Sequence, residues 1–228
     1  MIIQEQSQEI CFQIDYKVLE KKGIVIVGLS PENSYFKKET IHELLSFLTN
    51  LFSMLRIMIP DKPILHTYKA LGYSIQKAER KARLNGNTLK NHCNNSINEI
   101  LKIQSNKDIK IINWELEIES EENYLHELKA LFALYQSKTL FYEDVRSTKW
   151  QVIKKNMKDH SDIEKSLDEA VIYLLKELAF ILASPLMFKV ENIAFVYHTN
   201  WPPFENLIAG KYDGKIRKNI GFLICVKK

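Results

Sequence analysis

Hydrophobic positions along the chain switch between short continuous runs and longer stretches with helical spacing. Residues 23–29 (GIVIVGL) form a run rich in β-branched side chains, which is typical of a strand buried on both faces. A polar loop follows, and residues 38–55 then place apolar side chains three and four positions apart, which predicts a helix. A strand, a loop and a helix in this order begin an α/β unit.

The same alternation continues to the end of the chain. Further apolar runs predict strands at residues 57–59, 109–114, 190–197 and 220–226. Helical spacing predicts helices at residues 68–83, 87–103, 119–135, 141–157 and 161–182. Asn85-Gly86 is expected to separate the first two of these helices, and Ser161 with Glu164 forms a capping-box pattern. The sequence therefore predicts a single α/β domain over residues 1–228, with a largely parallel central sheet flanked by helices.

The composition agrees with a globular core. Hydrophobic residues make up 46% and charged residues 26%, which excludes a disordered chain. The apolar stretch at residues 170–188 contains Lys176 and Glu177, so a buried helix is expected there rather than a membrane span. The first residues lack the basic and apolar regions of a signal peptide.

Neither a disulfide framework nor a metal site is expected. The three cysteines, Cys11, Cys93 and Cys225, are far apart and form no CxxC pair, so reduced thiols in a cytoplasmic protein are expected. The pairs at residues 42–43 and 126–127 begin like HExxH but lack its second histidine. No GxGxxG or GxxxxGK[ST] motif occurs, so no nucleotide cofactor is expected.

Ser30 stands where the first predicted strand enters a loop. Ligands of open α/β sheets bind beyond the carboxyl ends of the strands, so this hydroxyl lies where chemistry is expected. Gly28-Leu29-Ser30 begins like the GxSxG turn of α/β-hydrolases, but the second glycine is missing. By itself, Ser30 fits a nucleophile or an ordinary loop residue.

Tyr173 and Glu177 are four residues apart on a predicted helix that is otherwise apolar. They therefore share one helical face. A glutamate on such a helix either belongs to a solvated stripe or is buried with a partner.

The net charge of +4 (32 basic minus 28 acidic residues) is concentrated in one segment. Residues 77–90 contain a single acidic residue, Glu79, and five basic ones: Lys77, Arg80, Lys81, Arg83 and Lys90. This segment is either a solvated helix face or a contact for a nucleic-acid backbone.

In combination these features resemble one family, the cyclodipeptide synthases. Residues 28–36 (GLSPENSYF) resemble its first signature, and residues 59–63 (IPDKP) with the following Thr67-Tyr68 and Gly72-Tyr73 resemble its second conserved stretch. Residues 173–178 (YLLKEL) resemble its YxxxEL motif. Residues 196–198 (VYH) fall where a further catalytic tyrosine is expected, and the basic segment falls where the family has a basic helix.

The resemblance implies a Rossmann-like fold similar to the catalytic domain of class I tyrosyl- and tryptophanyl-tRNA synthetases. It implies formation of a cyclic dipeptide from two aminoacyl-tRNAs, without ATP, cofactor, metal or membrane, by a protein expected to be a monomer. Ser30 would attack the ester of the first substrate and carry its aminoacyl group. Glu177 would hold the α-ammonium group and Tyr173 would orient it.

The remaining expected site residues also follow from the resemblance. Tyr197 would assist proton transfer, and Asn33 and His198 would shape the site. The basic residues of segment 77–90 would hold the first tRNA. An apolar or small uncharged first amino acid would lie in a pocket lined by Ile26, Gly28, Phe180 and Phe195.

Two other functions remain open at this point. One is an α/β serine hydrolase that uses Ser30. The other is a non-catalytic tRNA-binding module built on the basic segment.

Overall fold

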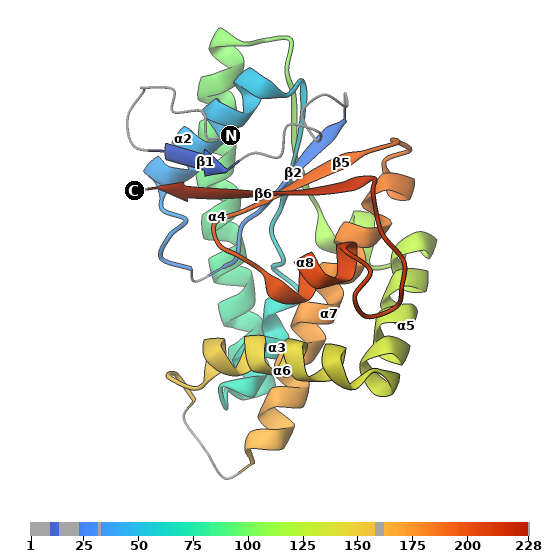
Figure 1. Ribbon diagram of the computed structural model, residues 1–228. Helices are drawn as coiled ribbons and strands as arrows, with labels where there is room; N and C mark the ends of the chain where they lie inside the picture. The colour runs from blue at the N-terminus through green and yellow to red at the C-terminus, as the bar shows by residue number, and fades with distance from the viewer. Residues whose placement is uncertain (1–9, 14–22, 32, 158–161, 228) are drawn as a thin grey trace.

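The computed structural model describes residues 10–13, 23–31, 33–157 and 162–227, and six strands in this part form one sheet in the order β1-β6-β5-β2-β3-β4 (Figure 1). The strands are β1 (Ile10–Gln13), β2 (Ile24–Gly28), β3 (Met54–Met58), β4 (Asp108–Ile112), β5 (Ile193–Tyr197) and β6 (Ile220–Lys227). Strands β4, β3, β2, β5 and β6 are parallel, and β1 pairs antiparallel with β6 at one edge. The prediction of a largely parallel sheet is confirmed.

Seven α-helices surround this sheet in the described part of the chain. They are α2 (Lys38–Leu51), α3 (Ile64–Ala70), α4 (Ile75–Ile103), α5 (Glu122–Ser137), α6 (Thr139–Ile153), α7 (Ile163–Met187) and α8 (Pro202–Ile208). Successive side chains of β2 point to opposite faces. Ile24 and Ile26 pack with α5, α7 and α8, whereas Val25 and Val27 pack with α2 and α4. Helices therefore cover both faces, as in a doubly wound α/β fold.

Helix α4 is one continuous helix, so the predicted break at Asn85-Gly86 is wrong. A Cβ on Gly86 would lie 2.5 Å from the Cβ of Asp61, so glycine lets the helix pass close to the loop after β3. The side-chain amide of Asn85 donates a hydrogen bond to the hydroxyl of Tyr68 at 2.7 Å. Gly86 thus permits a close contact between the helix and this loop, and this contact compensates for the low helix propensity of glycine.

Helix α7 is the central core helix, as predicted. It is long and apolar enough to cross a membrane, but 78% of its apolar window is buried inside the protein. Asp162 caps its first turn by accepting a hydrogen bond from the Lys165 backbone amide at 3.0 Å. Ser161 of the expected capping box lies outside the described residues.

Several boundaries differ from the expected ones. The helix predicted at residues 38–55 ends at Leu51, because residues 54–58 enter the sheet as β3. A separate short helix, α3, occupies part of the helix predicted at residues 68–83. Three of the described elements were not predicted at all: the short edge strand β1, the π-helical segment η1 (Trp114–Ile118), and α8, which begins with two prolines.

Candidate active site

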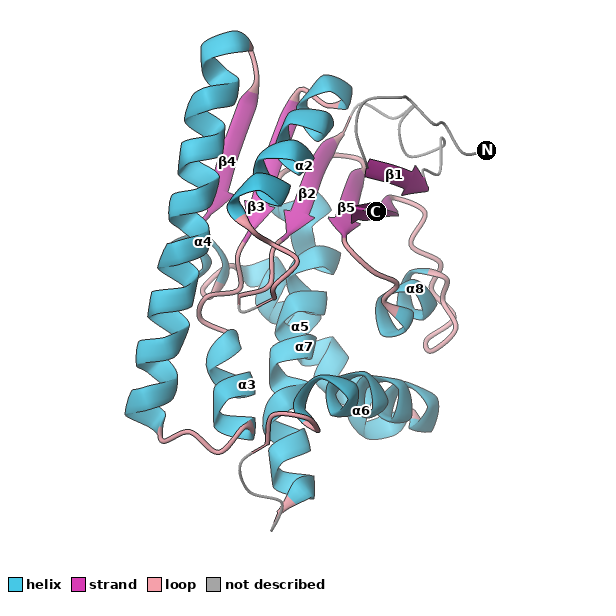
Figure 2. Cartoon of the chain, turned by 90° about the vertical axis from the view of Figure 1, so that its left-hand side faces the viewer, coloured by secondary structure: helices cyan, strands magenta, loops and turns pink. Residues whose placement is uncertain are grey.

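Four of the expected catalytic residues, Ser30, Asn33, Tyr197 and His198, lie at or just beyond the carboxyl ends of β2 and β5, and Tyr173 and Glu177 lie on helix α7. The arrowheads of the parallel strands point toward α3 and α6 (Figure 2). Ser30 comes two residues after β2, and Tyr197 is the last residue of β5. Because β2 and β5 are parallel neighbours, with Val27 opposite Val196, the residues that follow them meet at the same edge of the sheet.

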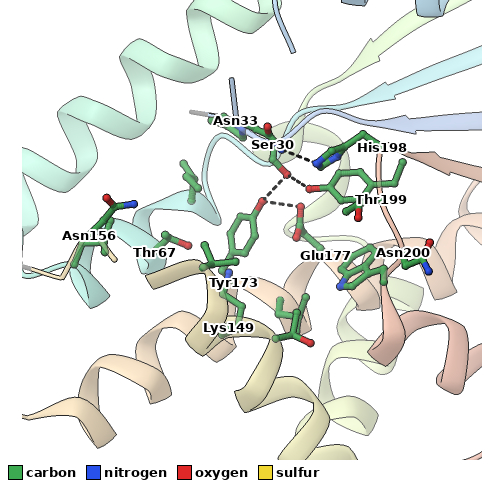
Figure 3. Close-up of a pocket in the computed structure, with 18 residues that line it drawn as sticks. Ser30, Asn33, Thr67, Lys149, Asn156, Tyr173, Glu177, His198, Thr199 and Asn200 are labelled. Atoms are coloured by element: carbon green, nitrogen blue, oxygen red, sulfur yellow. Dashed lines mark hydrogen bonds between the residues drawn. The ribbon is translucent and has the colours of Figure 1, made fainter. Parts of the chain in front are cut away.

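A chain of hydrogen bonds joins Ser30 to helix α7 (Figure 3). The hydroxyl oxygen of Ser30 is 2.8 Å from that of Tyr197 and 3.5 Å from that of Tyr173. Tyr173 donates a hydrogen bond to Oε1 of Glu177 at 2.7 Å. Glu177 is only 5% exposed, so the alternative of a solvated stripe on this helix is wrong.

Burial has the largest effect on the protonation of Glu177, Tyr173 and Tyr197. It raises the pKa of Glu177, while the Tyr173 hydrogen bond and the nearby Lys149 ammonium oppose that rise. Burial also raises the pKa values of Tyr173 and Tyr197, so both keep their hydroxyl protons near neutral pH. The site thus presents two phenolic donors and one carboxylate beside the Ser30 hydroxyl.

Asn33 and His198 form a second pair next to this chain. The Tyr35 backbone amide donates to Oδ1 of Asn33 at 3.0 Å, which leaves the Asn33 Nδ2 group to donate to Nε2 of His198 at 3.0 Å. His198 therefore carries its proton on Nδ1 when neutral. Burial lowers the pKa of His198 to about 4, so the ring is uncharged near neutral pH.

This arrangement is not that of a serine hydrolase. Among the described residues, the hydrogen-bond partners of the Ser30 hydroxyl are tyrosines, whereas His198 faces Asn33. A hydrolase triad requires an imidazole that accepts the serine proton and is itself oriented by a carboxylate.

All six expected catalytic residues border one cavity of about 390 Å³: Ser30, Asn33, Tyr173, Glu177, Tyr197 and His198. Its opposite wall comes from α3 and from α6 with the loop that follows, and includes Ile64, Thr67, Leu71, Lys149, Val152 and Asn156. The sequence reasoning missed this wall. One signal was available for Lys149, which continues the four-residue spacing of the buried Phe141, Val145 and Ile153.

The four residues expected to line the first amino-acid pocket do not border this cavity. Ile26, Phe180 and Phe195 are fully buried, and none of the four, Gly28 included, lines the cavity. The Phe195 ring covers Gly28 so closely that a Cβ there would lie 2.7 Å from its Cζ. It also stacks against Tyr197 with ring centroids 6.4 Å apart. Their role in selecting an amino acid stays a prediction.

The expected tRNA-binding residues divide into two groups. Lys77, Arg80 and Arg83 are exposed on α4, and the Lys81 ammonium lies 5.1 Å from the centroid of the Tyr73 ring. Lys90 lies farther along the helix and is paired with the Asp61 carboxylate at 2.5 Å. The charge of Lys90 is thus already compensated within the protein.

Among the described residues, the structure gives little support for a metal site or for a cysteine nucleophile. No group of three or more His, Cys, Asp or Glu side chains is placed there to hold a metal ion. Cys93 and Cys225 are free and buried, and burial raises the pKa of both thiols, that of Cys93 to about 12. Such thiols are poor nucleophiles.

The parallel sheet and the cluster at its carboxyl edge, which joins the partly buried Ser30 and Tyr197 to the buried Tyr173 and Glu177, are those of an α/β enzyme. The sequence model of the cyclodipeptide synthase family matches residues 13–227. The chain therefore belongs to the cyclodipeptide synthase family, and the resemblance in its motifs is confirmed.

Individual relatives agree with this assignment. The chain is 22% identical over 227 residues to the cyclo(L-leucyl-L-leucyl) synthase of Staphylococcus haemolyticus, covering 95% of each chain. A solved cyclodipeptide synthase structure from Staphylococcus haemolyticus has a TM-score of 0.81 at 21% identity and covers 95% of this chain and 99% of the other. A Mycobacterium tuberculosis structure, from a family described as related to type I tRNA synthetases, has a TM-score of 0.78 at 17% identity and covers all of both chains. The Rossmann-like fold is confirmed.

Proposed function

We propose that Ser30 is the nucleophile that takes the aminoacyl group of a first aminoacyl-tRNA, and that the protein joins it to a second one as a cyclic dipeptide. The observation that carries this proposal is the position of the Ser30 hydroxyl. It lies at the edge of the cavity, 2.8 Å from the Tyr197 hydroxyl and 3.5 Å from the Tyr173 hydroxyl that is bonded to Glu177.

In the first step the Ser30 oxygen bonds to the ester carbonyl carbon, and the bond from that carbon to the tRNA ribose oxygen breaks. The serine proton passes to the leaving ribose oxygen, with Tyr197 as the adjacent hydroxyl that can relay it. One ester replaces another, so the activation of the acyl group is kept and ATP is not required. The result is an aminoacyl-enzyme and free tRNA.

Glu177 binds the α-ammonium group of this aminoacyl-enzyme. A buried carboxylate without a cation is unfavourable, as the raised pKa of Glu177 indicates. An ammonium group at hydrogen-bond distance would compensate its charge, and such charge-assisted bonds are among the strongest in proteins. Tyr173 holds the carboxylate in place through its own hydrogen bond.

In the second step the α-amine of the second aminoacyl-tRNA bonds to the acyl carbon and the bond to Ser30 breaks. The amine gives up a proton and Ser30 regains one, which leaves a dipeptidyl-tRNA. The free amine of the dipeptide then attacks the remaining ester. This closes the ring and releases the second tRNA.

The first tRNA is held by basic residues of α4: the exposed Lys77, Arg80 and Arg83 and the partly buried Lys81. The first amino acid is apolar or small and uncharged, in keeping with the buried apolar residues Ile26, Phe180 and Phe195 that are expected to form its pocket. The relative from Staphylococcus haemolyticus is a cyclo(L-leucyl-L-leucyl) synthase. We further propose that the chain acts in the cytoplasm as one catalytic domain and as a monomer.

The test is to express the chain in bacteria and to analyse the medium for cyclic dipeptides by mass spectrometry. Ser30→Ala should abolish the product, whereas Ser105→Ala, an exposed serine far along the chain, should not change it. Trapping a radiolabelled aminoacyl group on the purified protein, but not on Ser30→Ala, would support the acyl-enzyme. Absence of any cyclic dipeptide from the unaltered protein would contradict the proposal.

A further inference from the structure

Lys149 of helix α6 is a buried lysine that borders the cavity. Its side chain is 3% exposed, and its neighbours one turn away, Val145 and Ile153, are fully buried. The ammonium nitrogen lies 4.2 Å from the centroid of the Tyr173 ring (Figure 3). Within the described part of the chain, Lys149 forms neither a hydrogen bond nor an ion pair shorter than 4 Å.

Among the described residues, the ionisable groups that border the cavity are Lys149, Glu177, Tyr173, Tyr197 and His198. The two tyrosines keep their protons and His198 is neutral near neutral pH, which leaves one cation and one anion. Lys149 and Glu177 influence each other's charge without contact, since no ion pair joins them. In the resting protein, the charges of the described residues that border the cavity therefore nearly cancel.

Binding of the first substrate changes this balance. Once an α-ammonium group pairs with Glu177, it neutralises the negative charge of this carboxylate. Lys149 then remains as a buried cation without an anionic partner among the described residues. Burial already lowers the pKa of Lys149, because an ammonium group loses its hydration there. A second substrate that brings an anion to Lys149 would restore neutrality.

A second polar group without a partner borders the same wall. Thr67 of α3 is 7% exposed, and its buried hydroxyl has no hydrogen-bond partner among the described residues. Asn156, just after α6, borders the same side of the cavity with a side-chain amide. An ammonium group, a hydroxyl and an amide are the donors that a carboxylate with two oxygens accepts from.

We propose that Lys149, with Thr67 and Asn156, binds the side-chain carboxylate of the second amino acid, so that the cyclic dipeptide contains one aspartyl or glutamyl residue. The inference rests on the proposed function, which places both substrates around Ser30. The acidic residue is assigned to the second substrate for two reasons. Glu177 would repel a carboxylate on the first, and the residues expected to line the first pocket, Ile26, Phe180 and Phe195, are buried and apolar and do not border the cavity with Lys149.

The direct test uses the unaltered purified protein with defined pairs of charged tRNAs. Leucyl-tRNA is offered with glutamyl-, glutaminyl-, aspartyl- or asparaginyl-tRNA, so that each acid is compared with its uncharged amide. We expect the acid to enter the product at least about tenfold faster than its amide. Equal or faster incorporation of the amides, or products made only of neutral residues, would overturn the inference. Labelled glutamate trapped on Ser30 would overturn its assignment to the second substrate.

Variants test whether the Lys149 ammonium group causes the preference for an acidic second amino acid. Lys149→Met keeps the length and apolar stem of the side chain, and should reduce the ratio of acid to amide incorporation by roughly tenfold or more. Lys149→Arg should keep the preference, and Lys129→Met, an exposed lysine on α5, should leave it unchanged. If Lys149→Met slows every substrate pair equally, the ammonium serves a tRNA phosphate or the fold, and the inference is wrong.

These outcomes are separable from failure of the proposed function. If no pair of aminoacyl-tRNAs yields a cyclic dipeptide, the proposed function itself is contradicted. If cyclic dipeptides form but contain two neutral residues, the synthase activity stands and the role of Lys149 is contradicted. The comparison with the unaltered protein decides this even if Lys149→Met fails to fold.

Discussion

Ser30 and Tyr197 are separated by 167 positions in the sequence, and their hydroxyl oxygens are 2.8 Å apart. The parallel pairing of β2 with β5 produces this contact, because both strands end at the same edge of the sheet. The Tyr197 hydroxyl keeps its proton near neutral pH, since burial raises its pKa. The Tyr197 hydroxyl is therefore placed to act as the proposed proton carrier for Ser30.

Replacement of Tyr197 by Phe should slow product formation by roughly 100-fold, the usual contribution of a positioned proton-transfer group. The ring keeps its packing against Phe195, so the fold should be retained. The rate of cyclic dipeptide formation by purified protein measures the effect. Tyr142→Phe, at a partly exposed position of α6, is the matched control. An unchanged rate in Tyr197→Phe would exclude a role for this hydroxyl.

Glu177→Gln should abolish loading of Ser30 while making the protein more stable at higher pH. Burial raises the folded-state pKa of Glu177 above its usual 4.5, so the folded protein binds a proton more tightly than the unfolded chain does. Stability contributed by this carboxyl should fall as pH rises from about 4.5 through the raised pKa.

Thermal unfolding across this pH range measures the effect. The unaltered protein should lose more stability with rising pH than Glu177→Gln does, whereas Glu191→Gln, at an exposed glutamate, should follow the unaltered protein. Aminoacyl loading of the unaltered protein should show the opposite trend and weaken as pH falls, because only the carboxylate binds an ammonium group. Identical stability profiles for Glu177→Gln and the unaltered protein would contradict the buried charge.

Gly28→Ala should destabilise the protein by about 1–3 kcal/mol, the usual cost of overpacking a core. The added Cβ would lie 2.7 Å from Cζ of Phe195 and 3.4 Å from Cδ2 of Tyr197. Adding Phe195→Leu should recover part of the loss, because the smaller side chain vacates this space. A denaturant-unfolding cycle over the two single variants and the double variant measures the coupling. Additive effects would show that the two positions do not compete for space.

The basic residues of α4 should separate into two classes by salt dependence. Lys77→Ala or Arg80→Ala should weaken tRNA binding and reduce the slope of log K against log salt by about 0.7–0.9 for each phosphate that is no longer neutralised. Lys90→Ala should leave this slope unchanged and lower stability by about 1–3 kcal/mol, since it removes the partner of Asp61. Binding titrations at several salt concentrations, with unfolding curves, distinguish the classes. A reduced slope in Lys90→Ala would show that Lys90 also binds tRNA.

Local patterns in the sequence were sufficient for the sheet and most helices. A strand such as β2, with every residue buried, reads as an unbroken apolar run, because both of its faces meet helices. The motif around Ser30, the YxxxEL segment and residues 196–198 were sufficient to indicate the family. These signals are local: each depends on residues a few positions apart.

Tertiary contacts determined features of the fold and the site that local sequence patterns do not predict. Gly86 reads as a helix break, but the approach of Asp61 makes it part of one continuous helix. Lys149 reads as one more surface lysine, yet the packing of α6 buries it in the cavity. The distance between Ser30 and Tyr197 likewise depends on strand pairing across the whole chain. The sequence thus indicated which residues are expected to carry the chemistry, whereas only the fold decided their distances, burial and charge, because these depend on contacts between remote segments.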